Sequence, residues 1–170
     1  AALIKSLEKA TTDPYIVDES VTTRYVLFSE WDLEPGELFG NKSGGLGYGL
    51  PASIGAAIAE SDREDRKETI GLIGDGSYLY YPQSIYTATK YDLDLTVVVS
   101  NNKSYQILKD NMVDIMGGNR NDHGFIAMDF DTDIDIAMNA ASLGADAVSI
   151  AEQEALESEI SDAVDSSGPS

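Results

Sequence analysis

Two apolar runs that each end in a short polar motif constrain this chain more than any other feature. The run at 69–73 leads into Gly-Asp-Gly-Ser at 74–77, and the β-branched run at 95–100 leads into Asn-Asn at 101–102. Both runs have the composition of buried strands. The 24 positions from 77 to 100 are enough for a helix and a return strand, so a right-handed crossover would place both motifs at one edge of a parallel sheet.

This placement would bring two oxygen-bearing side chains, Asp75 and Asn102, to the same edge of the sheet. Asp75 offers a carboxylate and Asn102 an amide oxygen at the edge where open α/β sheets bind their ligands. Together with a backbone carbonyl just beyond Asn102, these hard donors suit Mg²⁺, which also keeps water and phosphate oxygens as ligands. We therefore expect a Mg²⁺-diphosphate site, although either motif alone is also a common turn or strand end.

Small and hydroxyl-bearing residues next to Asp75 favour a phosphate at the same edge. Gly74 and Gly76 allow the backbone to approach a phosphate closely. Ser77 adds a hydroxyl ahead of an expected helix whose first turn carries Pro82, and helix starts bind anions.

These motifs resemble the cofactor-binding domain of thiamine diphosphate enzymes, whose signature is Gly-Asp-Gly followed after some two dozen residues by Asn-Asn. The loop Gly-Gly-Leu-Gly-Tyr-Gly-Leu-Pro-Ala at 44–52 and the motif at 74–77 look like the benzoylformate decarboxylase and acetolactate synthase branch. The same likeness extends to Tyr80, Gln83, Thr87, Ala88 and Tyr91. The resemblance covers nearly the whole chain and implies thiamine diphosphate and Mg²⁺ as cofactors.

The resemblance also implies roles for single residues. The carbonyl of Gly44 would accept a hydrogen bond from the aminopyrimidine, and Leu46 would be the apolar wedge that holds the cofactor bent, unless it is ordinary core. The carbonyl of Ser104 would be the third protein ligand to Mg²⁺, and Tyr105 would contact the cofactor.

Other residues near the expected site have two explanations that the sequence leaves open. The turn that contains Ser20 and Thr22 lies near the diphosphate in the resembled family, so either hydroxyl could donate to a phosphate oxygen. Ser20 could equally cap the helix expected at 24–31. Ile107 and Leu108 could line a substrate cavity or pack in the core.

Short apolar strands alternate with helical patterns along the chain. This alternation predicts a single α/β domain, residues 1–170, with a doubly wound, mostly parallel sheet and helices on both faces. Further strands are expected at 15–18, 38–39 and 147–150, and further helices at 24–31, 51–60, 134–142 and 152–164.

A glycine-containing stretch at 112–122 is expected to form a mobile loop over the site. The lone His123 lies at its end, and the sequence specifies no partner that would make it a general base.

The charge balance is strongly acidic, with 30 acidic against 11 basic residues, a net charge of -19, and 42% hydrophobic residues. An acidic surface over a normal core is typical of a halophile's protein, because in molar salt the Debye length shrinks to about 3 Å and self-repulsion is screened. An ordinary acidic protein is the alternative. Nucleic acids and membrane surfaces require clustered Lys or Arg, so neither partner is expected.

Cysteines, an apolar run near 18 residues and an amino-terminal leader pattern are all missing from the sequence. We therefore expect a cytoplasmic protein.

The resemblance implies that the cofactor site is shared with another domain. In the family, the glutamate that activates the pyrimidine ring comes from a separate pyrimidine-binding domain, normally of a neighbouring subunit. No segment of residues 1–170 resembles that domain, so we expect no catalytic residue in this chain, which looks like a piece of a larger enzyme. We also expect a pyrimidine-binding partner and a homodimer or tetramer. Whether the full enzyme also binds FAD stays open.

The implied reaction is decarboxylation of a small 2-oxo acid, or transfer of the resulting carbanion to an acceptor. The short glycine-rich loop at 44–49 favours the benzoylformate decarboxylase type, since acetolactate synthase-like carboligases usually carry a longer loop with a methionine wedge. Two other interpretations remain open. One is a non-catalytic cofactor-binding subunit, and the other is a generic α/β scaffold in which Gly-Asp-Gly is only a turn.

Overall fold

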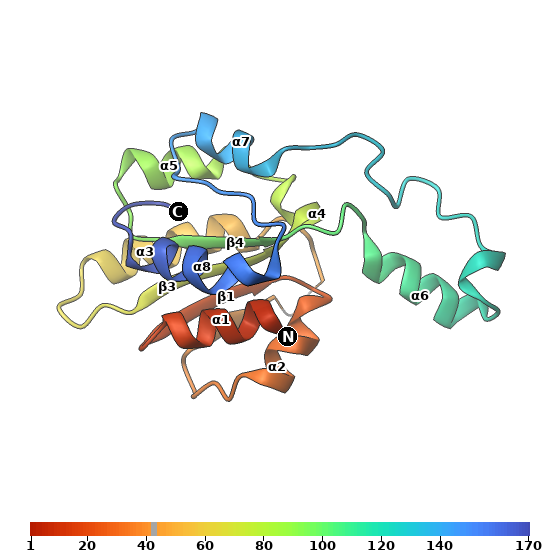
Figure 1. Cartoon of the computed structure of the whole chain (residues 1–170), viewed down its shortest axis with the longest axis horizontal. Helices are drawn as coiled ribbons and strands as arrows, with labels where there is room; N and C mark the ends of the chain where they lie inside the picture. Colours follow the sequence, from red (N-terminus) through yellow and green to blue (C-terminus); the bar gives the residue numbers. More distant parts are fainter. Residues whose placement is uncertain (42–43) are drawn as a thin grey trace.

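The computed structural model describes residues 1–41 and 44–170. Within these ranges, four parallel strands form one sheet at the centre of the domain (Figure 1). They are β1 (Pro14–Glu19), β2 (Leu38–Gly40), β3 (Glu68–Gly74) and β4 (Thr96–Ser100), in the order β2-β1-β3-β4. The strands expected at 15–18 and 38–39 and the two that end at the polar motifs are therefore present.

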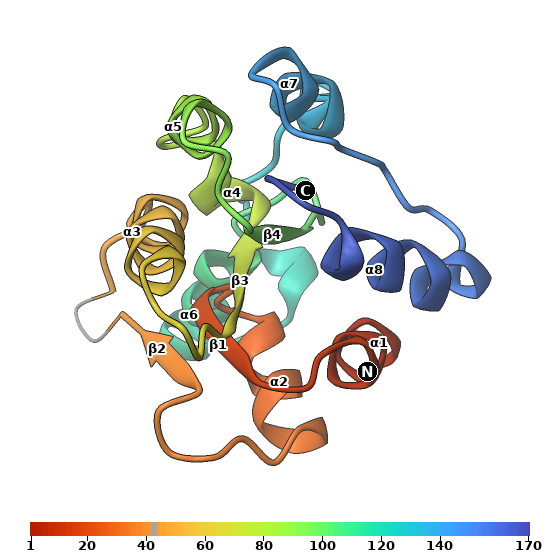
Figure 2. The same cartoon turned by 90° about the vertical axis from the view of Figure 1, so that its left-hand side faces the viewer.

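Helices cover both faces of the sheet (Figure 2). One face packs against α1 (Ala2–Ala10), α2 (Thr23–Glu30) and α8 (Leu156–Asp165), the last preceded by the short helix η2 (Gln153–Ala155). The other face packs against α3 (Gly49–Ser61), α4 (Asp75–Tyr78), α5 (Ser84–Lys90) and α7 (Ile136–Ser142). This arrangement confirms the predicted doubly wound parallel sheet.

The strand β3 is buried on both faces because its side chains alternate between the two helical layers. Ile70 and Leu72 pack with α1, α2 and α8, whereas Ile73 packs with α3 and α4. Between them Gly71 allows α3 to approach, since a Cβ there would lie 2.7 Å from the Oγ of Ser53. A larger residue at this position would push the helix off the sheet.

A buried carboxylate joins the end of β1 to the start of α3. The two carboxylate oxygens of Glu19 accept hydrogen bonds from the backbone N–H of Gly47, at 2.7 Å, and of Gly49, at 2.5 Å. Glu19 is only 3% exposed, and it satisfies amide groups at the start of a 13-residue helix, where a negative charge is favoured. This contact ties the glycine-rich loop to the sheet edge.

Three predicted elements were wrong. Residues 112–122 include the last five residues of α6 (Gln106–Met116) and the whole 3-10 turn η1 (Arg120–Asp122), because the glycine pair ends the helix, with Gly117 at φ +72°, instead of extending a loop. The helix expected after Ser77 is divided, so Ser77 lies inside α4 and Pro82 in the turn before α5. Residues 147–150 are extended but have no strand partner among the described residues.

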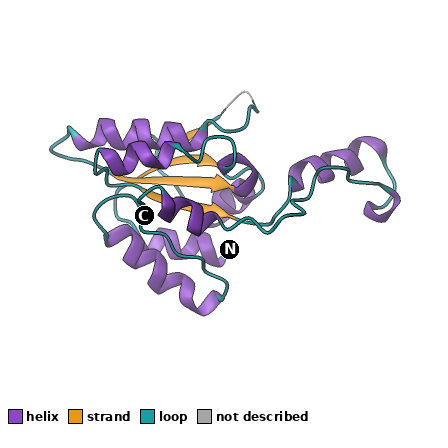
Figure 3. Ribbon diagram, turned by 90° about the horizontal axis from the view of Figure 1, so that it is seen from above, coloured by secondary structure: helices purple, strands orange, loops and turns teal. Residues whose placement is uncertain are grey.

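An arm made of α6, η1 and the segment that returns from them extends away from the sheet, as both Figures 1 and 3 show. In the first turn of α6, the Lys109 side chain is buried, pairs with Asp129 and lies over the ring of Phe125. Apolar side chains on the arm are left exposed, including Ile115 and Ile126. In the described part of the chain, no helix is long and apolar enough to cross a membrane.

Candidate cofactor and metal site

The carboxyl ends of β1, β3 and β4 meet at one edge of the sheet. Gly74 at the end of β3 pairs with Ser100 at the end of β4, and Glu19 at the end of β1 pairs with Ile73. A small pocket of about 40 Å³ lies at this edge. Nine of the ten predicted site residues line it: Thr22, Leu46, Gly74, Asp75, Gly76, Ser77, Asn102, Ser104 and Tyr105.

Gly44 is the predicted site residue that the pocket does not include. It is exposed, has φ +73° and follows residues 42–43, which lie outside the described ranges. Its expected contact with the cofactor therefore stays a prediction.

Asp75 is a buried carboxylate at the centre of this pocket's polar residues. Its side chain is 4% exposed, and its two oxygens accept hydrogen bonds from the backbone N–H of Gly76, at 2.7 Å, and of Asn102, at 3.0 Å. No Lys or Arg within residues 1–41 and 44–170 forms an ion pair with it. A buried carboxylate held only by neutral donors favours a cation, and these hydrogen bonds fix its orientation.

Asn102 and Ser104 complete a set of three oxygen donors. The Asn102 amide oxygen accepts a hydrogen bond from the Ser104 backbone N–H at 2.9 Å, which fixes the orientation of the amide. The chain turns sharply between them because Lys103 adopts φ +56°, a conformation that is uncommon outside glycine. A carboxylate, an amide oxygen and a backbone carbonyl fit the donor set that Mg²⁺ uses.

The returning segment of the arm holds the Ser104 turn in place. The Tyr105 N–H donates to the Met128 carbonyl at 2.8 Å, and the Phe130 N–H donates to the Lys103 carbonyl at 2.9 Å. The Ser104 hydroxyl also donates to the Met128 carbonyl, at 2.9 Å. This pairing uses the carbonyls and amides on either side of Ser104, and it leaves the carbonyl of Ser104 itself available to a metal.

Gly76 and Tyr105 lie in direct contact. A Cβ on Gly76 would lie 2.5 Å from the Cε1 of Tyr105, so the ring occupies the space that a side chain would need. Burial first, and then the Tyr80 phenol and the Asp75 carboxylate, raise the pKa of Tyr105, which keeps its hydroxyl protonated. Only the backbone and a neutral phenol are therefore presented here.

Gly74 is not required by packing in the same way. A Cβ there would make ordinary contacts, 3.6 Å from the Glu19 carbonyl oxygen and 3.8 Å from that of Ser20. Gly74 lines the pocket, but packing alone would allow a small side chain there.

The turn after β1 carries two hydroxyls that could donate to a phosphate oxygen, those of Ser20 and Thr22, and they have different partners. The Ser20 hydroxyl donates to Asp18 at 2.6 Å, and Asp18 in turn pairs with Arg24, so Ser20 is committed to a buried network. It does not cap α2, whose first position follows Thr22 and carries no side-chain cap. Thr22 therefore remains the candidate for donation into the pocket.

The pocket also contains residues that the sequence did not suggest and lacks some that it did. Val21 lines it in a left-handed conformation, φ 53°, which no sequence signal marks in a β-branched residue. Ile107 lines the pocket, whereas Leu108 is 45% exposed and lies outside it. His123 also lies outside it, with its Nε2 2.8 Å from the Gly117 carbonyl oxygen.

Comparison with known proteins places the chain among thiamine enzymes. The benzoylformate decarboxylase of Pseudomonas aeruginosa is 35% identical over 101 residues, which are 59% of this chain and 18% of that protein. A putative acetolactate synthase large subunit of Mycobacterium tuberculosis is 36% identical over 95 residues, 55% of this chain and 18% of that protein. This chain therefore spans less than a fifth of these relatives.

Solved structures share the fold over almost the whole chain. The thiamine diphosphate-dependent 4-hydroxybenzoylformate decarboxylase of Rhodococcus jostii matches 98% of this chain and 30% of its own, with a TM-score of 0.86 and 30% identity. The benzoylformate decarboxylase of Polynucleobacter necessarius has a TM-score of 0.89 at 24% identity, which shows the fold alone, over 98% of this chain and 31% of its own.

A profile of the family described as "Thiamine pyrophosphate enzyme, C-terminal TPP binding domain" matches residues 26–170. The match includes both polar motifs, the glycine-rich loop and the arm. The chain therefore belongs to this family of C-terminal, thiamine pyrophosphate-binding domains.

Proposed function

We propose that this chain binds the diphosphate of thiamine diphosphate through Mg²⁺, as one domain of an enzyme that decarboxylates a 2-oxo acid of the benzoylformate type. The single observation that carries the proposal is Asp75, a buried carboxylate without a cationic partner in the described part of the chain, beside the Asn102 amide and the Ser104 carbonyl. Asp75, Asn102 and the Ser104 carbonyl would hold Mg²⁺, which would neutralise the carboxylate and supply charge that attracts a diphosphate.

In this proposal, different residues of the chain bind the metal and the cofactor. Asp75, Asn102 and the Ser104 carbonyl would hold the metal, while the backbone at Gly76 and the hydroxyls of Thr22 and Ser77 would face the diphosphate. Leu46 would support the bent cofactor from the apolar side, the Gly44 carbonyl would accept from its aminopyrimidine, and the neutral Tyr105 would contact it from the arm. Thiamine diphosphate, when bound, supplies the carbon nucleophile and electron sink that decarboxylation of a 2-oxo acid needs.

The rest of the site would come from a second domain. The pocket of about 40 Å³ is far smaller than the roughly 300–1,000 Å³ of a ligand site, so it accounts for only part of a cofactor surface. Asp75 is the only carboxylate among the described residues that line it, and its place in the metal set excludes it as a proton carrier. We therefore propose a pyrimidine-binding partner domain that supplies the activating glutamate, within a homodimer or tetramer.

An acetolactate synthase-like carboligase is the second candidate, favoured by the relative in Mycobacterium tuberculosis. A third is a subunit that binds cofactor without turnover. Supplying the partner domain together with benzoylformate or pyruvate separates them: the decarboxylase releases an aldehyde, the carboligase a hydroxy-oxo acid, and the non-catalytic subunit neither.

The test of the metal assignment is a calorimetric titration of thiamine diphosphate, with and without Mg²⁺. Asp75→Asn and Asn102→Ala should each weaken Mg²⁺-dependent binding by roughly tenfold or more, because a lost oxygen ligand leaves the metal less neutralised. Binding measured without Mg²⁺ should change much less, which separates a metal ligand from a purely structural role.

Matched controls are available on the surface. Asp131→Asn and Asn111→Ala make the same chemical changes at exposed positions and should leave both titrations unchanged. Equal Mg²⁺-dependent affinities in the site variants and the unmodified chain would reject the metal assignment.

The acidic surface belongs to the same proposal. With a net charge of -19, the domain would carry out this binding in a halophile's salt-rich cytoplasm, where self-repulsion is screened.

A further inference from the structure

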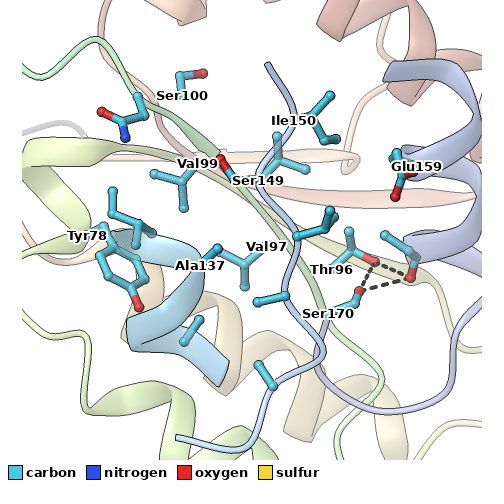
Figure 4. Close-up of a pocket in the computed structure, with 18 of the residues that line it drawn as sticks. Tyr78, Thr96, Val97, Val99, Ser100, Ala137, Ser149, Ile150, Glu159 and Ser170 are labelled. Carbon is cyan, nitrogen blue, oxygen red and sulfur yellow. Dashed lines mark hydrogen bonds between the residues drawn. The ribbon is translucent and has the colours of Figure 1, made fainter. Parts of the chain in front are cut away.

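The turn at 102–105, which carries two of the proposed metal ligands, has little support on the side of the sheet. There it borders an open groove of about 650 Å³, whose lining includes Ser100 at the end of β4 (Figure 4). Lys103 and Asp133 form an ion pair on the wall of this groove, but their side chains are 56% and 85% exposed, so solvent screens the pair. Lys103 also has φ +56°, and such a conformation persists only where neighbouring contacts hold it. The arm is the other source of such contacts.

Lys109, on the side of the arm, is a buried cation. Its side chain is 8% exposed, pairs with Asp129, and places its Nζ 5.5 Å from the centroid of the Phe125 ring. Of the Lys and Arg side chains that form ion pairs in the described residues, it is the most buried. An ammonium that leaves water needs a carboxylate or an aromatic face in its place, and Lys109 has both. These contacts fix the returning segment of the arm against α6.

Asp129 connects this ion pair to the turn. Asp129 and Ser104 face each other in an isolated antiparallel bridge. Beside the bridge, the N–H groups of Tyr105 and Phe130 donate between the two segments, at 2.8 and 2.9 Å, and the two rings pack edge to face with centroids 4.9 Å apart. Lys109 lies in the first turn of α6, so its bond to Asp129 closes a ring of contacts that contains Ser104.

Lys109 does not line the cofactor pocket itself. It is absent from the described residues that surround the cavity of about 40 Å³, whereas its neighbour Ile107 is present. Its charge is also paired with Asp129, so it is not free to bind an anionic ligand. An effect of Lys109 on the metal site would therefore pass through Ser104.

We propose that Lys109 is a positioning residue of the metal site, which acts through Asp129 to hold the Ser104 turn in its ligating conformation. This inference rests on the proposed function, which assigns Mg²⁺ to Asp75, Asn102 and Ser104. The Asn102 amide oxygen accepts the Ser104 N–H at 2.9 Å, so a displaced turn disturbs two of the three ligands at once. Residues that orient metal ligands in this way commonly change metal affinity without touching the metal.

The first test measures amide hydrogen exchange in the chain without metal or cofactor. Lys109→Met keeps most of the side-chain length but removes the charge, and exchange at the Tyr105 and Phe130 N–H groups should become at least about tenfold faster. Lys109→Arg keeps the charge and should stay within about threefold of the unmodified chain. The Leu72 amide, buried in β3, should keep its protection and so report that the domain is folded.

Matched variants separate this role from a general loss of stability. Lys9→Met makes the same change in an exposed pair with Glu157 and should leave both exchange rates unchanged. Asp129→Asn removes the partner of Lys109 at a half-exposed position and should accelerate exchange as Lys109→Met does. If Lys109→Met also exposes the amides of β3, Asp129→Asn decides the test. Unchanged exchange at Tyr105 and Phe130 in Asp129→Asn would overturn the proposal, whatever the metal does.

The second test is calorimetric titration of thiamine diphosphate with and without Mg²⁺. Lys109→Met and Asp129→Asn should each weaken the Mg²⁺-dependent affinity by about tenfold and leave binding without Mg²⁺ unchanged. The double variant should bind no more weakly than either single variant, because both changes remove the same link. A simple charge effect would instead move the two single variants in opposite directions, since one loses a cation and the other an anion.

The outcomes distinguish this inference from the function on which it rests. Faster exchange with unchanged Mg²⁺-dependent affinity, or affinities that move in opposite directions, would overturn the positioning role while Asp75→Asn still loses affinity. If Asp75→Asn binds as tightly as the unmodified chain, the proposed metal site itself is wrong, and the positioning role is wrong with it.

Discussion

Replacing Glu19 by Gln tests how the glycine-rich loop is held at the sheet edge. The carboxylate accepts two backbone N–H groups, from Gly47 and Gly49, and the side chain is only 3% exposed. Gln offers one oxygen, so its amide nitrogen would face one of these N–H groups and leave it unsatisfied. Such a loss costs about 1–3 kcal/mol, and loss of the negative charge at the helix start adds about 0.3–1 kcal/mol. We expect the free energy of unfolding to fall by about 1–4 kcal/mol.

Urea unfolding and thermal melting in molar salt measure this change. For a domain of this size the expected loss corresponds to about 2–16 °C in Tm. Glu8→Gln makes the same chemical change on the exposed face of α1 and should remain within about 0.5 kcal/mol of the unmodified chain. A Glu19→Gln protein as stable as the Glu8→Gln control would refute the idea that this buried carboxylate holds the loop.

Three further predictions concern packing, alkaline pH and salt. Gly76→Ala should displace the Tyr105 ring and cost about 1–3 kcal/mol of unfolding free energy, measured by urea unfolding, and an unchanged midpoint would contradict the contact. Burial raises the pKa of Tyr78 to about 12, and burial with Asp18 and Glu19 raises that of Tyr48 to about 12. Because the unfolded phenols ionise near 10, stability should be complete below pH 10 and should fall from pH 10 to 12, and Tyr78→Phe should reduce the fall. Thermal melting should show Tm rising steeply from low salt to about 1 M salt, and a flat profile would contradict self-repulsion at a net charge of -19.

Local pattern was sufficient to predict most of the fold. β-branched runs that end in glycine or asparagine identified β3 and β4, and the 24-residue spacing identified their parallel crossover. The apolar runs and the turn residues after them can be recognised in a single sequence, because strand burial and turn formation depend on a few neighbouring residues. The same logic placed the residues of the two strand-end motifs in one pocket, since parallel strands have their carboxyl ends together: Gly74, Asp75, Gly76, Ser77 and Asn102. The other four predicted residues that line the pocket, Thr22, Leu46, Ser104 and Tyr105, were implied by the family resemblance and not by local pattern.

Two predictions from local sequence patterns were wrong, the loop at 112–122 and the strand at 147–150. Gly117 suggested a loop, yet it ends α6, because a positive φ serves a helix end as well as a flexible segment. The sequence of 147–150 reads as a strand, but a strand exists only when a neighbour completes its hydrogen bonds, and no described residue does so.

The sequence by itself determined which oxygen-bearing residues follow β3 and β4, the parallel pairing of these strands, and the net charge of -19, because each depends on residue identity and short spacing. Only the tertiary structure decided that Glu19 caps α3, that Tyr105 fills the space over Gly76, and that Ser20 is committed to Asp18. These contacts depend on how the assembled chain packs: the Glu19 and Tyr105 contacts join residues far apart in the sequence, and Ser20 could have donated elsewhere. The same holds for the outer edge of β4, where Val97 donates to the distant Ser170 carbonyl, because this pairing is a property of the assembled sheet.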